Sequence, residues 1–237
     1  MTDNLPAKST PAEIAAFVEK LKAMPTVRTQ SRGRLLFAMD ATASREPSWD
    51  QACRIQAEMF EETKRLGGLE IQLAYYRGFG EFETTPWLTN AGELTRRMTE
   101  VSCLGGETQI GRVLRHAIAE ARQRKINAVV FVGDCMEEDV DRLCQDAGEL
   151  GLLGVPVFVF HEGGDIVAER AFKQIARLTN GAYCRFDSKS AGALADLLRA
   201  VAVFAAGGRS ALSELTHISK AASSMVLQLR GPGGQGD

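Results

Sequence analysis

The chain has 237 residues, of which 45% are hydrophobic and 24% are charged, and its formal net charge is -2. This length can bury one full hydrophobic core, and the near-neutral charge argues against nucleic-acid binding, which normally needs a basic surface. The first residues lack the pattern of a secretory signal, and no apolar run reaches the roughly 20 residues that span a bilayer. We therefore expect a cytoplasmic protein that binds neither nucleic acid nor membrane.

Cysteine and histidine residues form no recognised metal-binding or redox motif, since neither a CxxC pair nor HExxH occurs. The three histidines are far apart in the sequence, and we interpret them as structural or solvent-facing. We interpret the cysteines as reduced and mostly buried small apolar residues. They are Cys53, Cys103, Cys135, Cys144 and Cys184.

Strand-type and helix-type segments alternate along most of the chain. Apolar runs, typical of strands covered on both faces, predict strands at residues 34–39, 69–76, 127–133, 155–160 and 182–186. Between them, helical patterns occur at about residues 46–66, 89–102, 108–124, 138–152, 166–179 and 190–206. This alternation predicts an α/β fold with a doubly wound, mostly parallel central sheet and helices on both faces.

One further strand and two terminal regions complete the predicted organisation. The segment EFETT at about residues 81–85 follows the turn RGFG and is expected to pair antiparallel at the sheet edge. Residues 1–32 are expected to form an N-terminal helix, at 11–24, and a linker. The main domain is then residues 33–206, and residues 207–237 are a Gly-linked amphipathic segment with a disordered tail.

Oxygen-bearing side chains gather at the predicted carboxyl ends of two strands. Asp40 directly follows the first strand, with Thr42 and Ser44 at two-residue spacing, and Asp134 directly follows a central strand. Thr108 precedes the helix that leads into that central strand. Because ligands of open parallel sheets bind at this edge, we expect the five side chains to converge. Carboxylates and hydroxyls suit a hard cation, Mg²⁺ or Mn²⁺.

The local backbone around these residues should also favour an ion. If the loop after Asp40 is extended, residues two apart project to the same side, so Thr42 and Ser44 would form one arc of ligands with it. Gly105 and Gly106, just before Thr108, would let the backbone approach the ion closely. Without metal, Asp40 and Asp134 should repel each other, so Asp40→Ala should leave the metal-free protein at least as stable.

The sequence Asp40-Ala-Thr42-Ala-Ser44 after an apolar strand, Thr108 in GGET and Asp134 after a core strand resemble the metal-ion-dependent adhesion site of von Willebrand factor A (VWA) domains. The usual first motif is Asp-x-Ser-x-Ser, so Thr42 is a departure that keeps the hydroxyl. The resemblance covers about residues 33–204 and implies a Rossmann-like VWA fold. It also implies that the three hydroxyl residues bind the ion directly, and the two aspartates directly or through water.

The resemblance further implies a binding module and not an enzyme, with an Asp or Glu side chain or a terminal carboxylate of another protein completing the coordination of the ion. Intracellular proteins of this kind often serve multi-protein complexes, some with AAA+ ATPases. Arg45 could pair with a second acid of the partner, or be an ordinary solvated arginine. Phe79 and Phe82, near the RGFG turn, could contact the partner or cover the sheet edge.

Two other interpretations fit parts of the pattern. A haloacid-dehalogenase-like phosphohydrolase would use Asp40 as nucleophile, and its acidic metal loop resembles the segment with Asp134 and Asp139. However, Thr42 stands where the general acid is needed, and Lys125 precedes its strand instead of following it. Alternatively, the hydroxyl residues simply cap the helices that they precede.

Overall fold

The computed structural model describes residues 32–45, 68–186 and 198–207, and the single positions 16, 49, 63, 195 and 196. The helices expected at residues 11–24 and 46–66 lie outside these residues, apart from positions 16, 49 and 63. The segment after residue 207 lies outside them entirely. Within the described part of the chain, no helix is long and apolar enough to span a membrane.

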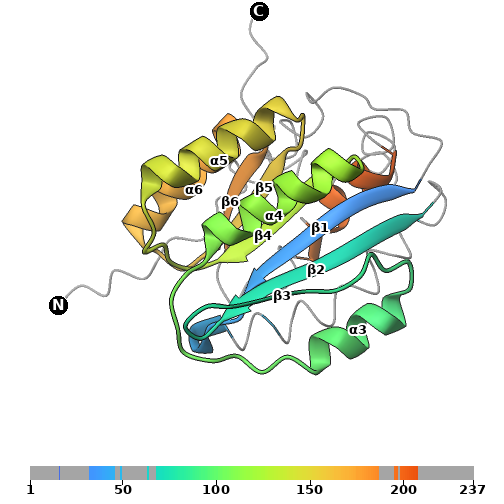
Figure 1. Ribbon diagram of the computed structural model, residues 1–237, viewed down its shortest axis with the longest axis horizontal. Coiled ribbons are helices and arrows are strands. Elements are labelled where there is room, and N and C mark those ends of the chain that lie inside the picture. Colours follow the sequence, from blue (N-terminus) through green and yellow to red (C-terminus); the bar gives the residue numbers. More distant parts are fainter. Residues whose placement is uncertain are drawn as a thin grey trace, which may run out of the picture.

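A six-stranded sheet forms the centre of the described structure, in the order β3-β2-β1-β4-β5-β6 (Figure 1). Only β3 runs antiparallel to its neighbour, β2, and the other neighbouring pairs are parallel. The expected doubly wound, mostly parallel sheet with one antiparallel edge strand is therefore confirmed. The strands are β1 (Gly33–Asp40), β2 (Leu69–Arg77), β3 (Glu81–Thr84), β4 (Ala128–Gly133), β5 (Val157–Glu162) and β6 (Ala182–Phe186).

Helices cover both faces of this sheet and create two hydrophobic cores. One core contains the apolar sides of three helices, α4 (Ile110–Gln123), α5 (Val140–Leu152) and α6 (Ile166–Leu178). The other contains α3 (Ala91–Thr99) and the helical residues 198–207. Because successive side chains of a strand face opposite sides, both cores draw on every central strand, which explains the nearly continuous apolar runs in the sequence.

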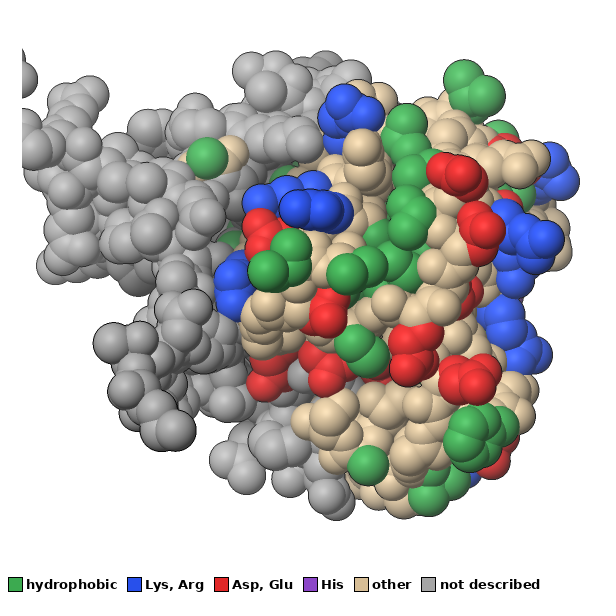
Figure 2. Space-filling view, turned by 90° about the vertical axis from the view of Figure 1, so that its left-hand side faces the viewer, with side chains coloured by type: hydrophobic (Ala, Val, Ile, Leu, Met, Phe, Trp, Pro, Cys, Tyr) green, Lys and Arg blue, Asp and Glu red, His purple; other side chains and the backbone are tan. Residues whose placement is uncertain are grey.

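Strand register brings the ends of β1, β2 and β4 to one edge of the sheet. Asp40, the last residue of β1, pairs with Tyr76 of β2, and Met39 pairs with Val132 of β4. Asp134 follows β4 directly, so it lies near the level of Asp40. Figure 2 looks onto this edge and shows acidic side chains gathered across its described part, with hydrophobic side chains between them. This edge is therefore the place to look for a cation site.

Candidate metal centre

The chain turns sharply after β1. The backbone N–H of Thr42 donates to Oδ1 of Asp40 at 2.7 Å, and the short 3-10 helix η1 (Ala43–Arg45) follows. The hydroxyls of Thr42 and Ser44 lie 3.3 Å apart. The expected extended loop was therefore wrong: a side-chain turn at Asp40 bends the backbone, and this turn, not alternation, brings the two hydroxyls together. Asp40 and Thr42 are buried, whereas Ser44 is exposed.

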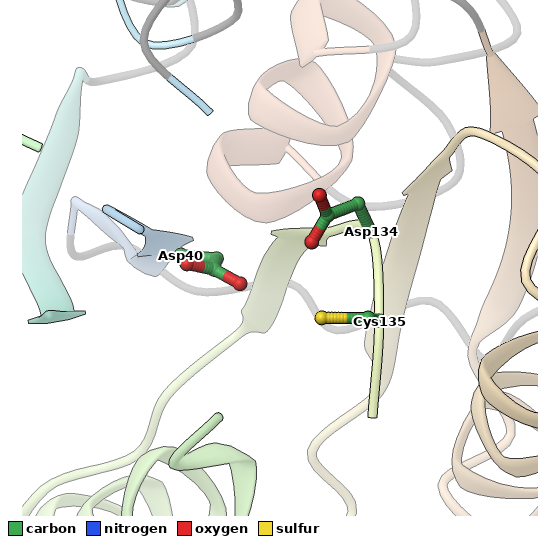
Figure 3. Close-up of side chains that lie close together, drawn as sticks. All are labelled: Asp40, Asp134 and Cys135. Carbon is green, nitrogen blue, oxygen red and sulfur yellow. The ribbon is translucent and has the colours of Figure 1, made fainter. Parts of the chain in front are cut away.

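Asp134 meets this turn from β4. Its Oδ2 accepts a hydrogen bond from the Ser44 hydroxyl at 2.7 Å. Ligand atoms of Asp40, Asp134 and the next residue, Cys135, all lie within 4.8 Å of one another. Figure 3 shows the three side chains pointing toward a common space at the ends of β1 and β4. Four of the residues in question, Asp40, Thr42, Ser44 and Asp134, are thus brought together by the ends of two adjacent strands.

Buried tyrosine and histidine side chains, which the sequence did not single out, support the two aspartates. Tyr76 donates its hydroxyl to Oδ2 of Asp40 at 3.2 Å. Burial, and then the charge of Asp40, raise the pKa of Tyr76 well above its usual value, so this hydroxyl keeps its proton. On the other side, Nε2 of His161 lies 3.1 Å from the backbone carbonyl of Asp134, and Nδ1 lies 2.8 Å from the Tyr183 hydroxyl.

The tautomer of His161 follows from these contacts. A carbonyl oxygen only accepts, so Nε2 carries the proton, and Nδ1 of a neutral ring accepts from Tyr183. Burial lowers the pKa of His161, which agrees with a neutral ring. Strand register offered a signal for both supporting residues, since Tyr76 pairs with Asp40 and His161 pairs with Gly133, next to Asp134. Both pairings follow once it is known that β2 lies beside β1 and that β5 lies beside β4.

Thr108 is joined to the loop after β4. Its N–H donates to Oε2 of Glu137 at 3.1 Å, and the N–H of Glu137 donates to Oγ1 of Thr108 at 3.0 Å. The carboxylate of Glu138 accepts from the N–H groups of Ile110 and, at 2.9 Å, Gly111. We call these four bonds the Thr108 clasp. They fix the Thr108 loop against the loop that carries Asp134.

Glu138 also supplies the cap of α4. Its carboxylate meets N–H groups in the first turn, which otherwise have no partner within the helix. The N-cap residue Gln109 makes no capping bond with its own side chain. The alternative that Thr108 merely caps its own helix therefore does not describe this structure: the cap comes from a residue in another loop. Burial raises the pKa of Glu138, although its hydrogen bonds to backbone N–H groups act in the opposite direction.

Cys135 completes the surroundings of the two aspartates. It is half-buried, and burial, together with the negative charge of Asp134, raises the pKa of its thiol to about 12. Without an ion the thiol is therefore protonated and neutral. It remains close to both carboxylates, as Figure 3 shows.

The aromatic residues expected to meet a partner differ from each other. Phe79, at the tip of the β2–β3 turn, is 83% exposed. Phe82 is half-buried, with its ring edge-on to His116 at 5.7 Å between centroids and the Arg112 guanidinium 5.3 Å from its ring centroid. Phe82 thus covers the sheet edge, which was the alternative expectation for it. The side chain of Arg45 lies outside the described part of the structure.

The turn that carries Phe79 is attached to the Thr108 loop. A Cβ atom added to Gly106 would lie 2.0 Å from the carbonyl oxygen of Gly78, so only glycine permits this contact. Glu107 N–H donates to the same oxygen at 3.3 Å, and Arg112 donates to the Gly80 carbonyl at 2.6 Å. Gly106 therefore makes its close backbone approach to the β2–β3 turn, whereas the sequence predicts that this approach is to the ion.

The chemistry of these residues fits a divalent cation. Two carboxylates and the hydroxyls of Thr42 and Ser44 offer oxygen atoms, the ligands that Mg²⁺ and Mn²⁺ prefer. A phosphohydrolase site fits less well. Lys125, the lysine considered for that activity, lies at the opposite end of the sheet, where its carbonyl accepts from Arg34 at 3.4 Å.

No protein-family model and no curated protein sequence matches the chain. Solved structures match it in fold. A structure of the mussel byssus protein PTMP1 with a zinc-occupied metal-ion-dependent adhesion site has 13% identity and a TM-score of 0.58 over 73% of this chain. A von Willebrand factor type A protein from Catenulispora acidiphila has 14% identity and a TM-score of 0.58 over 73% of it. The SpRpn10 VWA domain has 13% identity and a TM-score of 0.53 over 66% of it.

The share of the matched chains that this chain covers differs among the three structures. This chain spans 46% of the PTMP1 chain and 42% of the Catenulispora chain, but 87% of the SpRpn10 VWA domain. This chain therefore spans less than half of the two longer chains and most of the SpRpn10 VWA domain. Strand order, the antiparallel edge strand and these structural matches agree with one another. The described part of this chain has the fold of von Willebrand factor A domains.

Proposed function

We propose that this protein is a non-enzymatic, metal-dependent protein-binding module, in which an ion at the carboxyl edge of the sheet binds an acidic group of a partner. One observation carries the proposal: Asp40 and Asp134, 94 positions apart in sequence, place their carboxylates together at the ends of adjacent strands, with Ser44 bonded to Asp134. The zinc-occupied adhesion site of the similar PTMP1 structure supports it.

Each residue has a distinct part in this proposal. Asp40 would bind the ion from the protein interior, because it is buried and is held by the Thr42 N–H and the Tyr76 hydroxyl. Ser44 is exposed, so the partner would approach on its side. A bound Mg²⁺ or Mn²⁺ ion supplies the Lewis acidity that attracts one further anionic oxygen. The Thr108 clasp would hold the Thr108 hydroxyl at the border of the site.

Partner contacts beyond the ion would come from neighbouring loops. Phe79 offers an exposed aromatic ring, and such rings often contribute strongly to protein interfaces. We expect Arg45 to pair with a second acid of the partner. An AAA+ ATPase complex and a cytoplasmic location stay predictions. Affinity capture with and without EDTA, and with Asp134→Asn as bait, would identify a partner whose binding needs the ion.

Ion binding itself tests the proposal most directly. Thermal unfolding should be followed while MgCl₂ or MnCl₂ is added to the wild type, Asp40→Asn and the control Glu149→Gln, which alters an exposed ion pair with Arg122. At about 100 times Kd the wild type and the control should gain about 2.7 kcal/mol, and Asp40→Asn should gain nothing. An equal response of all three proteins, or none, would overturn the proposal.

A further inference from the structure

We propose that Cys135 is itself a ligand of the ion, and that its sulfur gives the site a preference for Zn²⁺ and chemically similar ions such as Co²⁺. This inference rests on the proposed function in one respect, namely that a divalent cation occupies the space between Asp40 and Asp134. It adds the identity of a ligand and the class of metal. From the sequence alone, Cys135 is interpreted as one of several reduced, mostly buried cysteines.

The geometry assigns Cys135 to the same space as the two aspartates. Its Sγ atom and the carboxylate oxygens of Asp40 and Asp134 all lie within 4.8 Å of one another. For three atoms so arranged, there is a point that lies within about 2.8 Å of all of them. A Zn–S bond is about 2.3 Å long and a Zn–O bond about 2.0–2.2 Å, so this point is close to bonding distance. Short side-chain movements therefore suffice for all three to bind one ion.

The side chains also have the required direction. Asp134 and Cys135 are consecutive in the loop after β4, and Figure 3 shows both pointing toward Asp40 at the ends of β4 and β1. Cys135 is half-buried, as is Asp134, and Asp40 is wholly buried. A cysteine that only filled space in the core would not need to face two carboxylates. Here the sulfur borders the oxygen atoms that an ion would use.

The resulting ligand set differs from an all-oxygen site. Thiolate sulfur is a soft ligand that favours Zn²⁺ over Mg²⁺, and one thiolate with two carboxylates leaves the fourth tetrahedral position for the acidic oxygen of a partner. As the metal–sulfur bond forms, the proton of the Cys135 thiol passes to solvent, and no oxidant is required. Almost any nitrogen, oxygen or sulfur site binds Zn²⁺ more tightly than Mn²⁺, so the decisive property is dependence on Cys135.

Cobalt spectroscopy reads this dependence directly. CoCl₂ is titrated into the full chain as wild type, Cys135→Ser and the matched control Cys144→Ser, which alters another half-buried cysteine, on α5. The wild type and the control should develop a near-ultraviolet sulfur-to-cobalt charge-transfer band, and Cys135→Ser should not. Zn²⁺ competition should then show at least about tenfold weaker binding to Cys135→Ser, with MgCl₂ affinity unchanged.

Other outcomes separate this inference from the proposed function. Cobalt binding to all three proteins without a charge-transfer band would overturn the role of Cys135 and leave the metal-dependent module intact. Equal loss of Mg²⁺ and Zn²⁺ affinity in Cys135→Ser would also overturn it, because the thiol would then support the loop and not select the ion. If the wild type binds none of the ions, both proposals fail.

Discussion

The amino end of the sheet and the candidate site at its carboxyl end hold their acidic side chains in different ways. At the amino end, Arg34 is buried, and its guanidinium lies 3.2 Å from the Glu120 carboxylate. Its Cζ atom lies 3.7 Å from the ring centroid of Trp87, and the Trp87 indole N–H donates to Glu120 at 2.7 Å. Arg124 donates two hydrogen bonds, of 3.0 and 3.2 Å, to the Glu70 carboxylate. At the carboxyl end, Asp40 and Asp134 accept hydrogen bonds from neutral hydroxyl and backbone N–H groups.

This difference separates stability from function within one domain. At the amino end, the positive charge of each arginine neutralises the negative charge of the glutamate beside it. We therefore interpret this network as a contribution to the stability of the fold. A neutral donor fixes a carboxylate in place and adds no positive charge beside it. The loop DCMEED, with acids at four of its six positions, adds to that charge at the carboxyl end. The acidic side chains at the carboxyl end therefore favour the binding of a cation.

Breaking the amino-end network should have the largest effect on stability. Arg34→Met removes one partner of a buried ion pair and should lower the free energy of unfolding by about 3 kcal/mol, measured by urea denaturation. The control is Arg122→Met, because Arg122 forms an exposed pair with Glu149 at 2.6 Å and should contribute less than about 1 kcal/mol. Metal binding should not change in either variant. Equal losses would show that the burial of Arg34 is irrelevant.

Asp40 provides the next largest effect and reverses an expectation from the sequence. Asp40→Ala leaves the Thr42 N–H and the buried Tyr76 hydroxyl without their acceptor, so the metal-free protein should lose about 2 kcal/mol. Asp40→Asn keeps an acceptor oxygen and should lose less, yet it should bind no ion. Urea denaturation in EDTA compares the two. An alanine variant as stable as the wild type would restore the view that repulsion with Asp134 dominates.

The Thr108 clasp should contribute a smaller amount. Glu138→Ala uncaps α4 and should cost about 1 kcal/mol, with faster hydrogen exchange at Ile110 and Gly111. Asp165→Ala is a matched control, since Asp165 caps α6 by accepting from the Ala168 N–H at 2.6 Å. It should have a similar cost but leave α4 protected. Unchanged exchange at α4 in Glu138→Ala would refute the clasp.

The smallest effect lies between the two ends, at His116. Burial lowers its pKa, only partly offset by Glu120, so the unfolded chain binds the proton more readily than the folded one. This contribution to stability is present above the unfolded pKa of about 6.5 and is lost as the pH falls through the lower folded pKa. His116→Gln should therefore flatten the fall in urea midpoint below about pH 6.5. An identical pH profile would exclude His116 as the titrating residue.

Much of the fold and part of the site could be predicted from the sequence. The strand-end rule places Asp40 and Asp134 together because it depends only on strand order. The pairing of β1 with β2 offers a signal for the support that Tyr76 gives to Asp40. The bonds from Glu138 to α4 could not be predicted, because they join residues 27 and 28 positions apart whose side chains carry no periodic signal. The bend after Asp40 cannot be predicted, because a two-residue spacing is compatible with both an extended loop and a side-chain turn.

The contact between Gly78 and Gly106 limits how this surface can diversify. Gly78 and Gly80 have φ values of 56° and 103°, which L side chains rarely adopt, and Gly106 has no room for a Cβ atom. Position 79, between the two turn glycines, carries a ring that is 83% exposed. A mutant library for new binding specificities should therefore randomise position 79 and keep all three glycines, since a change of turn length would also displace the backbone beside Thr108.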